Sequence, residues 1–185
     1  VKYDITLPEE YIAFVGSIEP RKNVETLIDS FELLAQRYKE LHLVLAGSLG
    51  WLSKKVFKKI KTSPSRDRIH YLGYITEEQK RSILSNAKVF VFPSFYEGFG
   101  LPVLESMAAG CPVVAGATGS LPELIDEAGI LINPHQTHEL ASAIASILSN
   151  KEQAKVYANA GRKRAQLYSW DVAASKTFDI LKGDI

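Results

Sequence analysis

The hydrophobic positions of this chain gather into short, nearly continuous apolar runs, and each run is closed by glycine or proline. Six such runs lie at residues 11–15, 41–46, 68–72, 88–92, 112–115 and 129–132. Short unbroken apolar runs are typical of parallel strands that are buried on both faces of a sheet. The pattern therefore predicts a mostly parallel sheet.

The segments between these runs have the residue spacing of amphipathic helices. One apolar stripe comprises Val24, Leu27, Ile28, Phe31, Leu34, Ala35 and Tyr38, and another comprises Leu140, Ile144, Ile147 and Leu148. Thr76 and Gln79 have the spacing of a capping box at a helix start, and so do Ser120 and Glu123. Toward the C-terminus the pattern fits two further helices with a break near Ser169.

Strands that alternate with helices imply βαβ units with right-handed crossovers. We expect one Rossmann-like α/β domain over residues 1–185, a doubly wound sheet of about six parallel strands flanked by helices. In such a sheet, ligands bind beyond the carboxyl ends of the strands. The residues that follow each predicted strand are therefore the candidates for a site.

Composition narrows the classes of function. The 185 residues are 46% hydrophobic and 23% charged, with a formal net charge of +1, as in an ordinary soluble globular domain. This charge creates no whole-protein field that would attract nucleic acid or an anionic membrane, so any phosphate site must be local. The sequence shows no membrane-spanning stretch and no signal-peptide pattern, and we expect a cytoplasmic protein.

The residue types of metal chemistry are sparse. The single cysteine, Cys111, can form no internal disulfide and lies in an apolar run, which favours a buried side chain over a nucleophile. The four histidines do not cluster, because His42 and His70 lie in predicted strands and His135 and His138 near a helix start. We therefore expect no metal site.

Two other chemistries are also disfavoured. Ser94 and Ser106 have no histidine in a context that suits a serine triad. The aromatic residues are not interleaved with basic ones, so we expect no nucleic-acid partner, and Trp170 is interpreted as a packing residue.

The first candidate site follows the first predicted strand, in the segment from Gly16 and Ser17 to Asn23. Asn23 is placed to cap the next helix, whose N-terminus would favour an anion. Arg21 can bind a phosphate with two donors, and Lys22 supplies a compact positive charge. The alternative is that both are solvated basic residues, and the segment is not a dinucleotide fingerprint.

The most informative segment follows the fourth predicted strand and reads EGFGLPVLE over residues 97–105. Gly98 and Gly100 permit a positive φ or a close backbone approach. A helix that begins near Leu101 or Pro102 would present free N–H groups to an anion.

The two carboxylates at the ends of this segment, Glu97 and Glu105, would be repelled by a phosphate. We therefore predict that they accept hydrogen bonds from neutral hydroxyl groups at opposite ends of one ligand, such as a phosphate that carries sugars. The alternative is that Glu97 is an ordinary loop residue and Glu105 an ordinary surface residue of a helix.

Two weaker candidates follow the second and third predicted strands. They are the segment from Gly47 to Gly50 and the segment Gly73-Tyr74-Ile75. Both would line the same edge of the sheet, where a flat nucleobase could lie against the backbone near Tyr74 and Ile75. Ordinary strand-to-helix turns have the same appearance.

In their order along the chain, these motifs resemble the C-terminal, nucleotide-sugar-binding half of the retaining GT-B glycosyltransferases of the glycosyl transferase group 1 family. The resemblance covers almost the whole chain, and the Glu-x7-Glu element formed by Glu97 and Glu105 is a specific marker. The other matching segments are FVG at 14–16, PRKN at 20–23, LAG at 45–47, YLGY at 71–74, FPS at 92–94, YEGFGLP at 96–102, PVV at 112–114, GSLPE at 119–123 and SW at 169–170.

The resemblance implies a role for each matching residue. Arg21 and Lys22 would hold the donor diphosphate and stabilise the charge of the leaving nucleoside diphosphate. Glu97 would contact the transferred sugar, and Glu105 would bind the ribose hydroxyls. The remaining donor-binding positions would be Gly16, Ser17, Gly47, Tyr74, Ile75, Gly98, Phe99, Gly100 and Leu101. Transfer would retain the anomeric configuration and would need no tightly bound metal or other cofactor.

Two details bear on the donor. Ser17 stands where many members of the family have arginine, and Arg21 could supply that charge from four residues later. The Pro-Arg-Lys-Asn form resembles bacterial and archaeal mannosyltransferases, which favours GDP-mannose over a UDP-sugar.

The resemblance also implies a missing half. Group 1 enzymes carry the acceptor site on an N-terminal domain, so this chain would bind the donor and catalyse little alone. The whole protein would act on a glycan or lipid-linked acceptor, in peripheral contact with the inner face of a membrane. The alternatives are a nucleotide-sugar epimerase or phosphorylase on the same fold, and a non-catalytic nucleotide-sugar-binding module.

Overall fold

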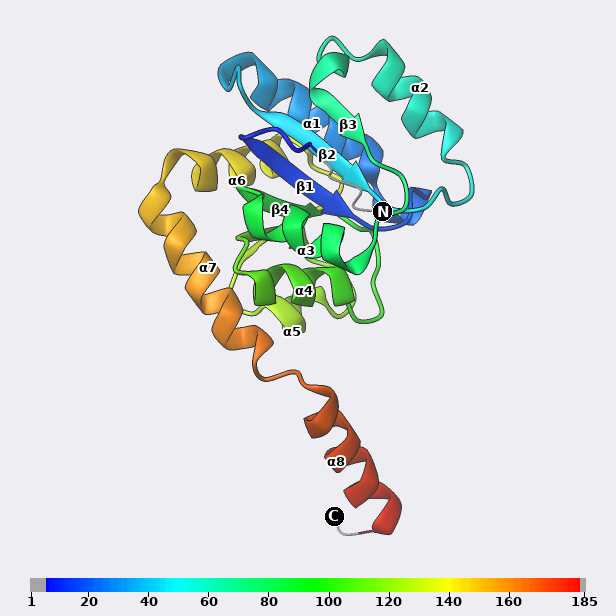
Figure 1. The fold of residues 1–185 in the computed structure, drawn as a ribbon, viewed down its shortest axis with the longest axis vertical. Helices are drawn as coiled ribbons and strands as arrows, with labels where there is room; N and C mark the ends of the chain where they lie inside the picture. The colour runs from blue at the N-terminus through cyan, green and yellow to red at the C-terminus, as the bar shows by residue number, and fades with distance from the viewer. Residues whose placement is uncertain (1–5, 184–185) are drawn as a thin grey trace.

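Each apolar run that was predicted to be a strand is a strand in the computed structural model, which describes residues 6–183. The strands are β1 (Tyr11–Val15), β2 (His42–Ala46), β3 (Ile69–Tyr71), β4 (Val89–Phe92), β5 (Val113–Gly116) and β6 (Ile130–Ile132). All pair in parallel in one six-stranded sheet with the order β3-β2-β1-β4-β5-β6 (Figure 1). The predicted doubly wound sheet is confirmed.

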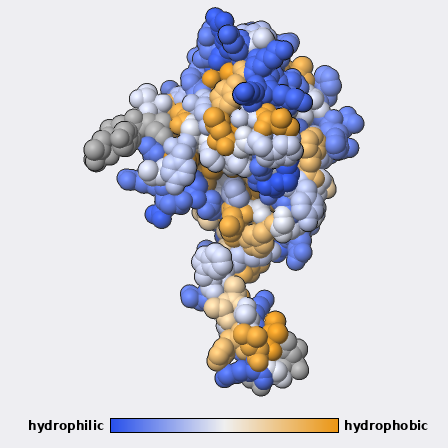
Figure 2. Space-filling view, turned by 90° about the vertical axis from the view of Figure 1, so that its right-hand side faces the viewer, coloured by the Kyte–Doolittle hydropathy of each residue, from blue (hydrophilic) through white to orange (hydrophobic). Residues whose placement is uncertain are grey.

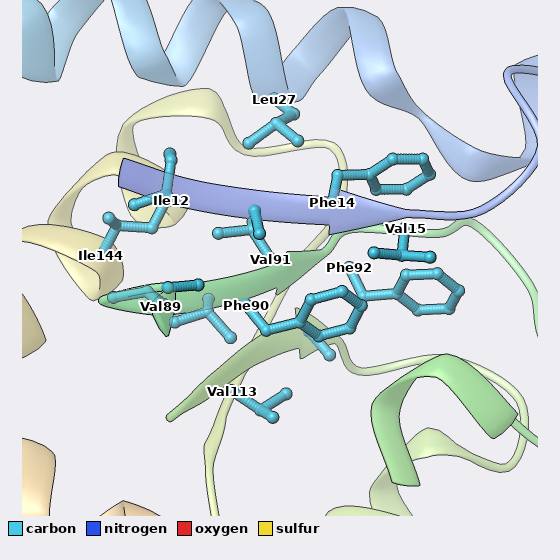
Figure 3. Close-up of a cluster of buried hydrophobic side chains, with 14 of the residues drawn as sticks. Ile12, Phe14, Val15, Leu27, Val89, Phe90, Val91, Phe92, Val113 and Ile144 are labelled. Carbon is cyan, nitrogen blue, oxygen red and sulfur yellow. The ribbon is translucent and has the colours of Figure 1, made fainter. Parts of the chain in front are cut away.

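The core is centred on the two middle strands, β1 and β4, whose residues are all buried. Figure 3 shows side chains from these strands together with those of neighbouring helices, such as Leu27 and Ile144. The ring of Phe92 stacks on those of Phe14 and Phe90, with both pairs of ring centroids 5.8 Å apart. Helices cover both faces of these strands, which explains why their sequences are apolar without alternation.

Eight α-helices lie in the described part of the chain. They are α1 (Val24–Arg37), α2 (Lys54–Thr62), α3 (Glu77–Asn86), α4 (Leu101–Ala109), α5 (Leu121–Ile125), α6 (Thr137–Ser149), α7 (Lys151–Ala165) and α8 (Trp170–Lys182). Helix α1 packs against α2 and α6, while α4 packs against α3 and α7. None of these helices in residues 6–183 combines the length and the hydrophobicity that crossing a membrane requires.

One of the two predicted capping boxes is present. At the start of α3, the Gln79 N–H donates to Thr76 Oγ1 (3.2 Å), and the Thr76 N–H donates to Gln79 Oε1 (2.8 Å). The prediction for Ser120 is wrong, because its hydroxyl caps no helix and donates instead to the carbonyl oxygen of Glu97, at 3.2 Å. The Ser120 hydroxyl thus bonds to the Glu97 carbonyl of a distant loop instead of taking part in the predicted capping box with Glu123.

The predicted break near Ser169 is confirmed, since Ser169 Oγ accepts a hydrogen bond from the Val172 N–H (3.1 Å) and α8 begins there. Helix α8 then projects away from the rest of the molecule (Figure 1). Trp170 is 82% exposed, so its interpretation as a packing residue is wrong within residues 6–183. Figure 2 shows hydrophobic atoms gathered on this projecting helix.

The expectation of a buried Cys111 is confirmed. Its environment has few partners for a charged sulfur, and burial raises the pKa of its thiol to about 12. At neutral pH the side chain is therefore a protonated thiol, which is a poor nucleophile.

His42 on β2 and His70 on β3 form a pair, with His42 Nδ1 and His70 Nε2 2.9 Å apart. Burial is the largest cause that lowers the pKa of both imidazoles below the usual 6.5. The charge of Arg68 also lowers the pKa of His42, while Glu40 acts in the opposite direction.

This pair predicts a pH-dependent stability. In the unfolded chain, both histidines become protonated as the pH falls below their ordinary pKa of about 6.5. In the folded chain their pKa values are lower, so they bind fewer protons at the same pH. The free energy of unfolding should therefore fall as the pH drops from about 7.5 to about 5.5, and less so in the double variant His42→Gln/His70→Gln. Urea unfolding at both pH values measures this difference, and His138→Gln, which alters an exposed histidine, is the control. An unchanged pH dependence in the double variant would contradict the assignment.

Candidate functional site

The candidate site lies where the order of the strands reverses. From β1 the chain continues to β2 on one side, whereas the neighbouring strand β4 leads to β5 on the other side. The loops that leave β1 and β4 therefore diverge, and this is where doubly wound sheets bind ligands. A hydrogen bond from the Phe95 N–H to the Arg21 carbonyl oxygen (2.9 Å) joins the two loops.

The loops after β1, β2 and β3 also meet at this edge, as the sequence predicts. The Gly16 N–H donates to the Ala46 carbonyl oxygen (2.9 Å), and the Gly47 N–H donates to that of Gly73 (2.7 Å). Gly47 has a φ of +139°, and a Cβ atom there would lie only 2.0 Å from the Gly16 carbonyl oxygen. Only glycine allows the first two loops to approach this closely.

A cluster of charges forms the centre of the site. Lys22 Nζ lies 2.7 Å from Glu97 Oε1, and Arg21 Nη1 lies 3.0 Å from Glu97 Oε2. Arg21 Nη2 also lies 2.8 Å from Glu19 Oε1. Lys22 and Glu97 are both only 7% exposed, so the alternative of a solvated basic residue is wrong for Lys22. Arg21 is 41% exposed at its side chain, and the role of Glu97 stays a prediction.

The surroundings orient both basic residues of this cluster. Lys22 Nζ lies 4.7 Å from the centroid of the Phe92 ring, a cation–π contact at the end of β4. Partial burial acts to lower the pKa of Arg21, but its hydrogen bonds to Glu97 and Glu19 and their negative charges outweigh this effect and raise it. An arriving anion would find two fixed positive side chains, with Glu97 between them.

Asn23 is the N-cap residue of α1, as predicted, but the expectation that its side chain caps the helix is wrong. Asn23 is buried and has a φ of +55°, and its side chain makes no capping hydrogen bond to α1. Its Nδ2 atom donates instead to the carbonyl oxygens of Pro93 (3.0 Å) and Pro134 (2.7 Å). A buried amide needs partners for both of its N–H bonds, and these two carbonyls provide them. Asn23 therefore holds together the loops that follow β1, β4 and β6.

Helix α4 begins at Leu101 with Pro102 in its first turn, as predicted. The backbone N–H groups of Gly98, Phe99, Gly100 and Leu101 donate no hydrogen bond to any acceptor within residues 6–183. Together with the dipole of the helix, they form a row of donors that suits an anion.

The two glycines of this segment differ from each other. Gly100 has the predicted positive φ, +100°. Gly98 has no positive φ, and a Cβ atom there would meet no described atom within 4 Å. For Gly98 the close backbone approach of a ligand therefore stays a prediction, and its Cβ position faces open space that a ligand could enter.

Glu105 lies one turn into α4 and has a partner that the sequence analysis missed. Lys80 Nζ of α3 lies 2.7 Å from Glu105 Oε1 and 2.9 Å from Glu77 Oε2. Burial acts to lower the pKa of Lys80, but these two carboxylates outweigh it and raise that pKa. Glu105 Oε2 has no hydrogen bond to the described residues, so it can still accept one from a ligand. No local sequence signal could have revealed this pair, because its members are 25 positions apart.

The other predicted positions lie at the same edge without joining the charged cluster. Tyr74 is 83% exposed, and Phe99 and Leu101 are 43% and 49% exposed. No hydrogen bond or ion pair within the described residues links Ser17 or Ile75 to the cluster. Over residues 6–183, no group of three histidine, cysteine, aspartate or glutamate side chains is arranged to hold a metal ion. The exposed side chains of Tyr74, Phe99 and Leu101 lie on an open edge of the sheet.

The strand order and this edge define a Rossmann-like domain of the GT-B glycosyltransferase type. Sucrose-phosphate synthase from Thermosynechococcus elongatus has the same fold, with a TM-score of 0.86 and 31% identity over 95% of this chain and 45% of that one. The chain belongs to the family Glycosyl transferases group 1, whose family model matches residues 2–164. The expectation of one half of a GT-B fold is thus confirmed.

Two further comparisons show which members of the family this chain is similar to. O-antigen chain mannosyltransferase B of Escherichia coli is 32% identical over 173 residues, which are 93% of this chain and 45% of that protein. The C-terminal domain of a glycosyl transferase group 1 family protein from Francisella tularensis has a TM-score of 0.77 and 26% identity, with 85% of each chain covered. The chain therefore spans less than half the length of its full-length mannosyltransferase relative.

Proposed function

We propose that this chain is the donor-binding domain of a retaining mannosyltransferase that uses a nucleotide-diphosphate sugar. The observation that carries the proposal is the placement of two cations, Arg21 and Lys22, at the strand-order reversal. They lie on the loop after β1 and are paired with Glu97 of the β4 loop, which leads to the unpaired N–H groups at the start of α4. This combination suits a diphosphate better than any other common ligand group.

In this proposal the diphosphate lies between the β1 loop and the start of α4. Arg21 is 41% exposed at its side chain and can turn one face of its guanidinium toward the ligand while it keeps its bond to the Tyr96 carbonyl oxygen (2.8 Å). Lys22 is buried and contributes its charge from behind Glu97. The N–H groups of Gly98 to Leu101 bind phosphate or sugar oxygens.

The two carboxylates bind the neutral parts of the donor. Glu105 accepts hydrogen bonds from the ribose hydroxyls through Oε2, while Lys80 holds Oε1 and fixes the rotamer. Glu97 lies at the other end of the segment, beside the sugar that is transferred. The base lies along the backbone near Gly73, Tyr74 and Ile75.

The chemistry asked of this domain is stabilisation of the leaving group. As the bond between the sugar C1 and the phosphate oxygen breaks, negative charge grows on the departing diphosphate. Arg21, Lys22 and the N-terminus of α4 stabilise that charge without large rearrangement. The acceptor hydroxyl attacks from the same face of the sugar and passes its proton to the leaving phosphate oxygen, so the anomeric configuration is retained.

The sugar and the acceptor are inferred from the mannosyltransferase relative and from the Pro-Arg-Lys-Asn segment. They favour mannose as the sugar, with GDP ahead of UDP as its carrier, and a glycan or lipid-linked acceptor. The acceptor side of the open edge is completed by a second domain, so this chain alone is inactive. The whole enzyme works in the cytoplasm at the inner face of the membrane.

Calorimetric titration of the chain with GDP, UDP and ADP tests the proposal. We expect one nucleotide, GDP, to bind most tightly, and Glu105→Ala to weaken it by about tenfold through the loss of the hydrogen bonds to ribose. Glu127→Ala, which removes an exposed carboxylate elsewhere, should bind as the wild type does.

Two outcomes separate the alternatives. No binding of any of the three nucleotides would contradict the donor-site assignment. Nucleotide binding by the whole protein, without transfer of mannose or glucose to any acceptor, would instead favour a non-catalytic module.

A further inference from the structure

Helix α2 and the loop before it carry an uneven charge. Residues 51–65 include five lysines and no acidic residue. The rest of the chain therefore has a formal net charge of −4, since the whole chain carries +1. A local field of this kind persists at the surface even though the net charge of the molecule is small.

Most of these lysines are free to meet a partner. Lys59 lies 2.5 Å from Asp29 of α1. Lys54, Lys55, Lys58 and Lys61 are exposed and form no ion pair with any residue in the range 6–183. Lys54, Lys58 and Lys61 recur at the helical spacing that aligns them on one face of α2.

Other side chains of α2 pack against the domain. Val56 is 5% exposed, and the ring of Phe57 meets that of Tyr71 edge-on at 4.9 Å between centroids. The lysine row therefore lies on a helix that packs against the domain.

Large apolar side chains stand beside the start of this row. Leu49, Trp51 and Leu52 are 58%, 64% and 54% exposed. Leu52 has a φ of +56°, which is rare for a residue with a branched side chain. In Figure 2 the side that carries α2 faces the viewer, and hydrophobic patches lie among strongly hydrophilic ones in its upper part.

The geometry points to a docking surface for an anionic lipid bilayer, formed by Leu49, Trp51, Leu52 and the lysine row of α2. Apolar side chains beside lysines match the boundary between lipid headgroups and acyl chains, where tryptophan is favoured. A nucleic acid would leave the two leucines in water, and a second copy of the chain would bring two rows of lysines together. The bilayer is the occupant that satisfies both the charges and the apolar groups.

This surface adjoins the candidate site but does not depend on nucleotide binding. Leu49 pairs with Ile18 in an isolated parallel bridge, and the Gly50 N–H donates to the Ile18 carbonyl oxygen at 3.1 Å. The apolar group therefore lies next to the loop that carries Arg21 and Lys22. Docking would hold the side of the molecule that carries α2 against the bilayer, beside the edge that binds the donor.

Vesicle co-sedimentation of the 185-residue chain tests the inference. We expect binding to vesicles of equal parts phosphatidylcholine and phosphatidylglycerol, weaker binding at high salt, and little binding to phosphatidylcholine alone. The triple variant Lys54→Gln/Lys58→Gln/Lys61→Gln should bind about a hundredfold more weakly, since each lysine contributes about fivefold. Trp51→Ser/Leu52→Ser should weaken binding by at least about tenfold.

Two matched controls make the test specific. Lys151→Gln/Lys155→Gln/Lys163→Gln removes the same charge from exposed positions on α7, and Trp170→Ser/Leu181→Ser removes exposed apolar groups from α8. Both should bind as the wild type does. The inference is overturned if the mixed vesicles are not bound, or if either control weakens binding as much as its α2 counterpart. Thermal unfolding of each variant confirms that it is folded, and nucleotide titration reports on the donor site separately.

Discussion

Replacing Lys22 by methionine should weaken nucleoside diphosphate binding by about thirtyfold, the effect of one lost charge-assisted interaction. It should also lower the free energy of unfolding by about 2 kcal/mol. The second effect arises because Glu97, at 7% exposure, would keep a buried charge with only Arg21 as a partner. Methionine has nearly the same length as lysine, so packing on Phe92 is retained while the charge is lost.

The double variant Lys22→Met/Glu97→Gln separates these two effects. Removal of both charges leaves no unpaired buried ion, so most of the lost stability should return. Nucleotide affinity should not return, because the positive charge of Lys22 is still absent. Urea unfolding and calorimetric titration of both variants measure the two quantities, with the exposed Lys39→Met as the control. If the double variant bound nucleotide as tightly as the wild type, Lys22 would have no direct role in the site.

Replacing Gly47 by alanine should lower the free energy of unfolding by about 3–4 kcal/mol, more than most single substitutions. The new Cβ atom would lie 2.0 Å from the Gly16 carbonyl oxygen, and the φ of +139° is one that alanine rarely adopts. The oxygen belongs to the backbone, and the position of a Cβ atom is fixed by its own backbone, so no side-chain rotation can relieve the clash. The loops after β1 and β2 would have to separate, which would also displace the segment that carries Arg21 and Lys22.

Two neighbouring glycines provide matched controls. Gly73 has a φ of +70° but open space at its Cβ position, so Gly73→Ala should cost only about 1 kcal/mol from backbone strain. Gly98 has neither constraint, and Gly98→Ala should change stability by less than about 0.5 kcal/mol. Chemical denaturation measures the free energy of unfolding of the three variants and so ranks their losses of stability. Equal losses at Gly47 and Gly73 would show that the close approach of the loops is not what requires glycine.

Local patterns in the sequence determined the fold almost completely. Buried parallel strands have continuous apolar runs, and all six predicted runs are strands in the structure. The capping box at Thr76 and the start of α4 at Leu101 were predictable because their partners lie within one helical turn. The segment from Glu97 to Glu105 could also be singled out, since helix N-termini and glycine turns have strong local signatures.

Only the tertiary structure decided which partner each polar group takes. The sequence predicts local partners for the side chains of Asn23 and Ser120, yet both donate to carbonyls of distant loops. Lys80 became part of the site only because α3 and α4 pack together. Buried polar groups need hydrogen-bond partners. Which partners are available depends on the segments that the tertiary structure brings together, and not on nearness in sequence.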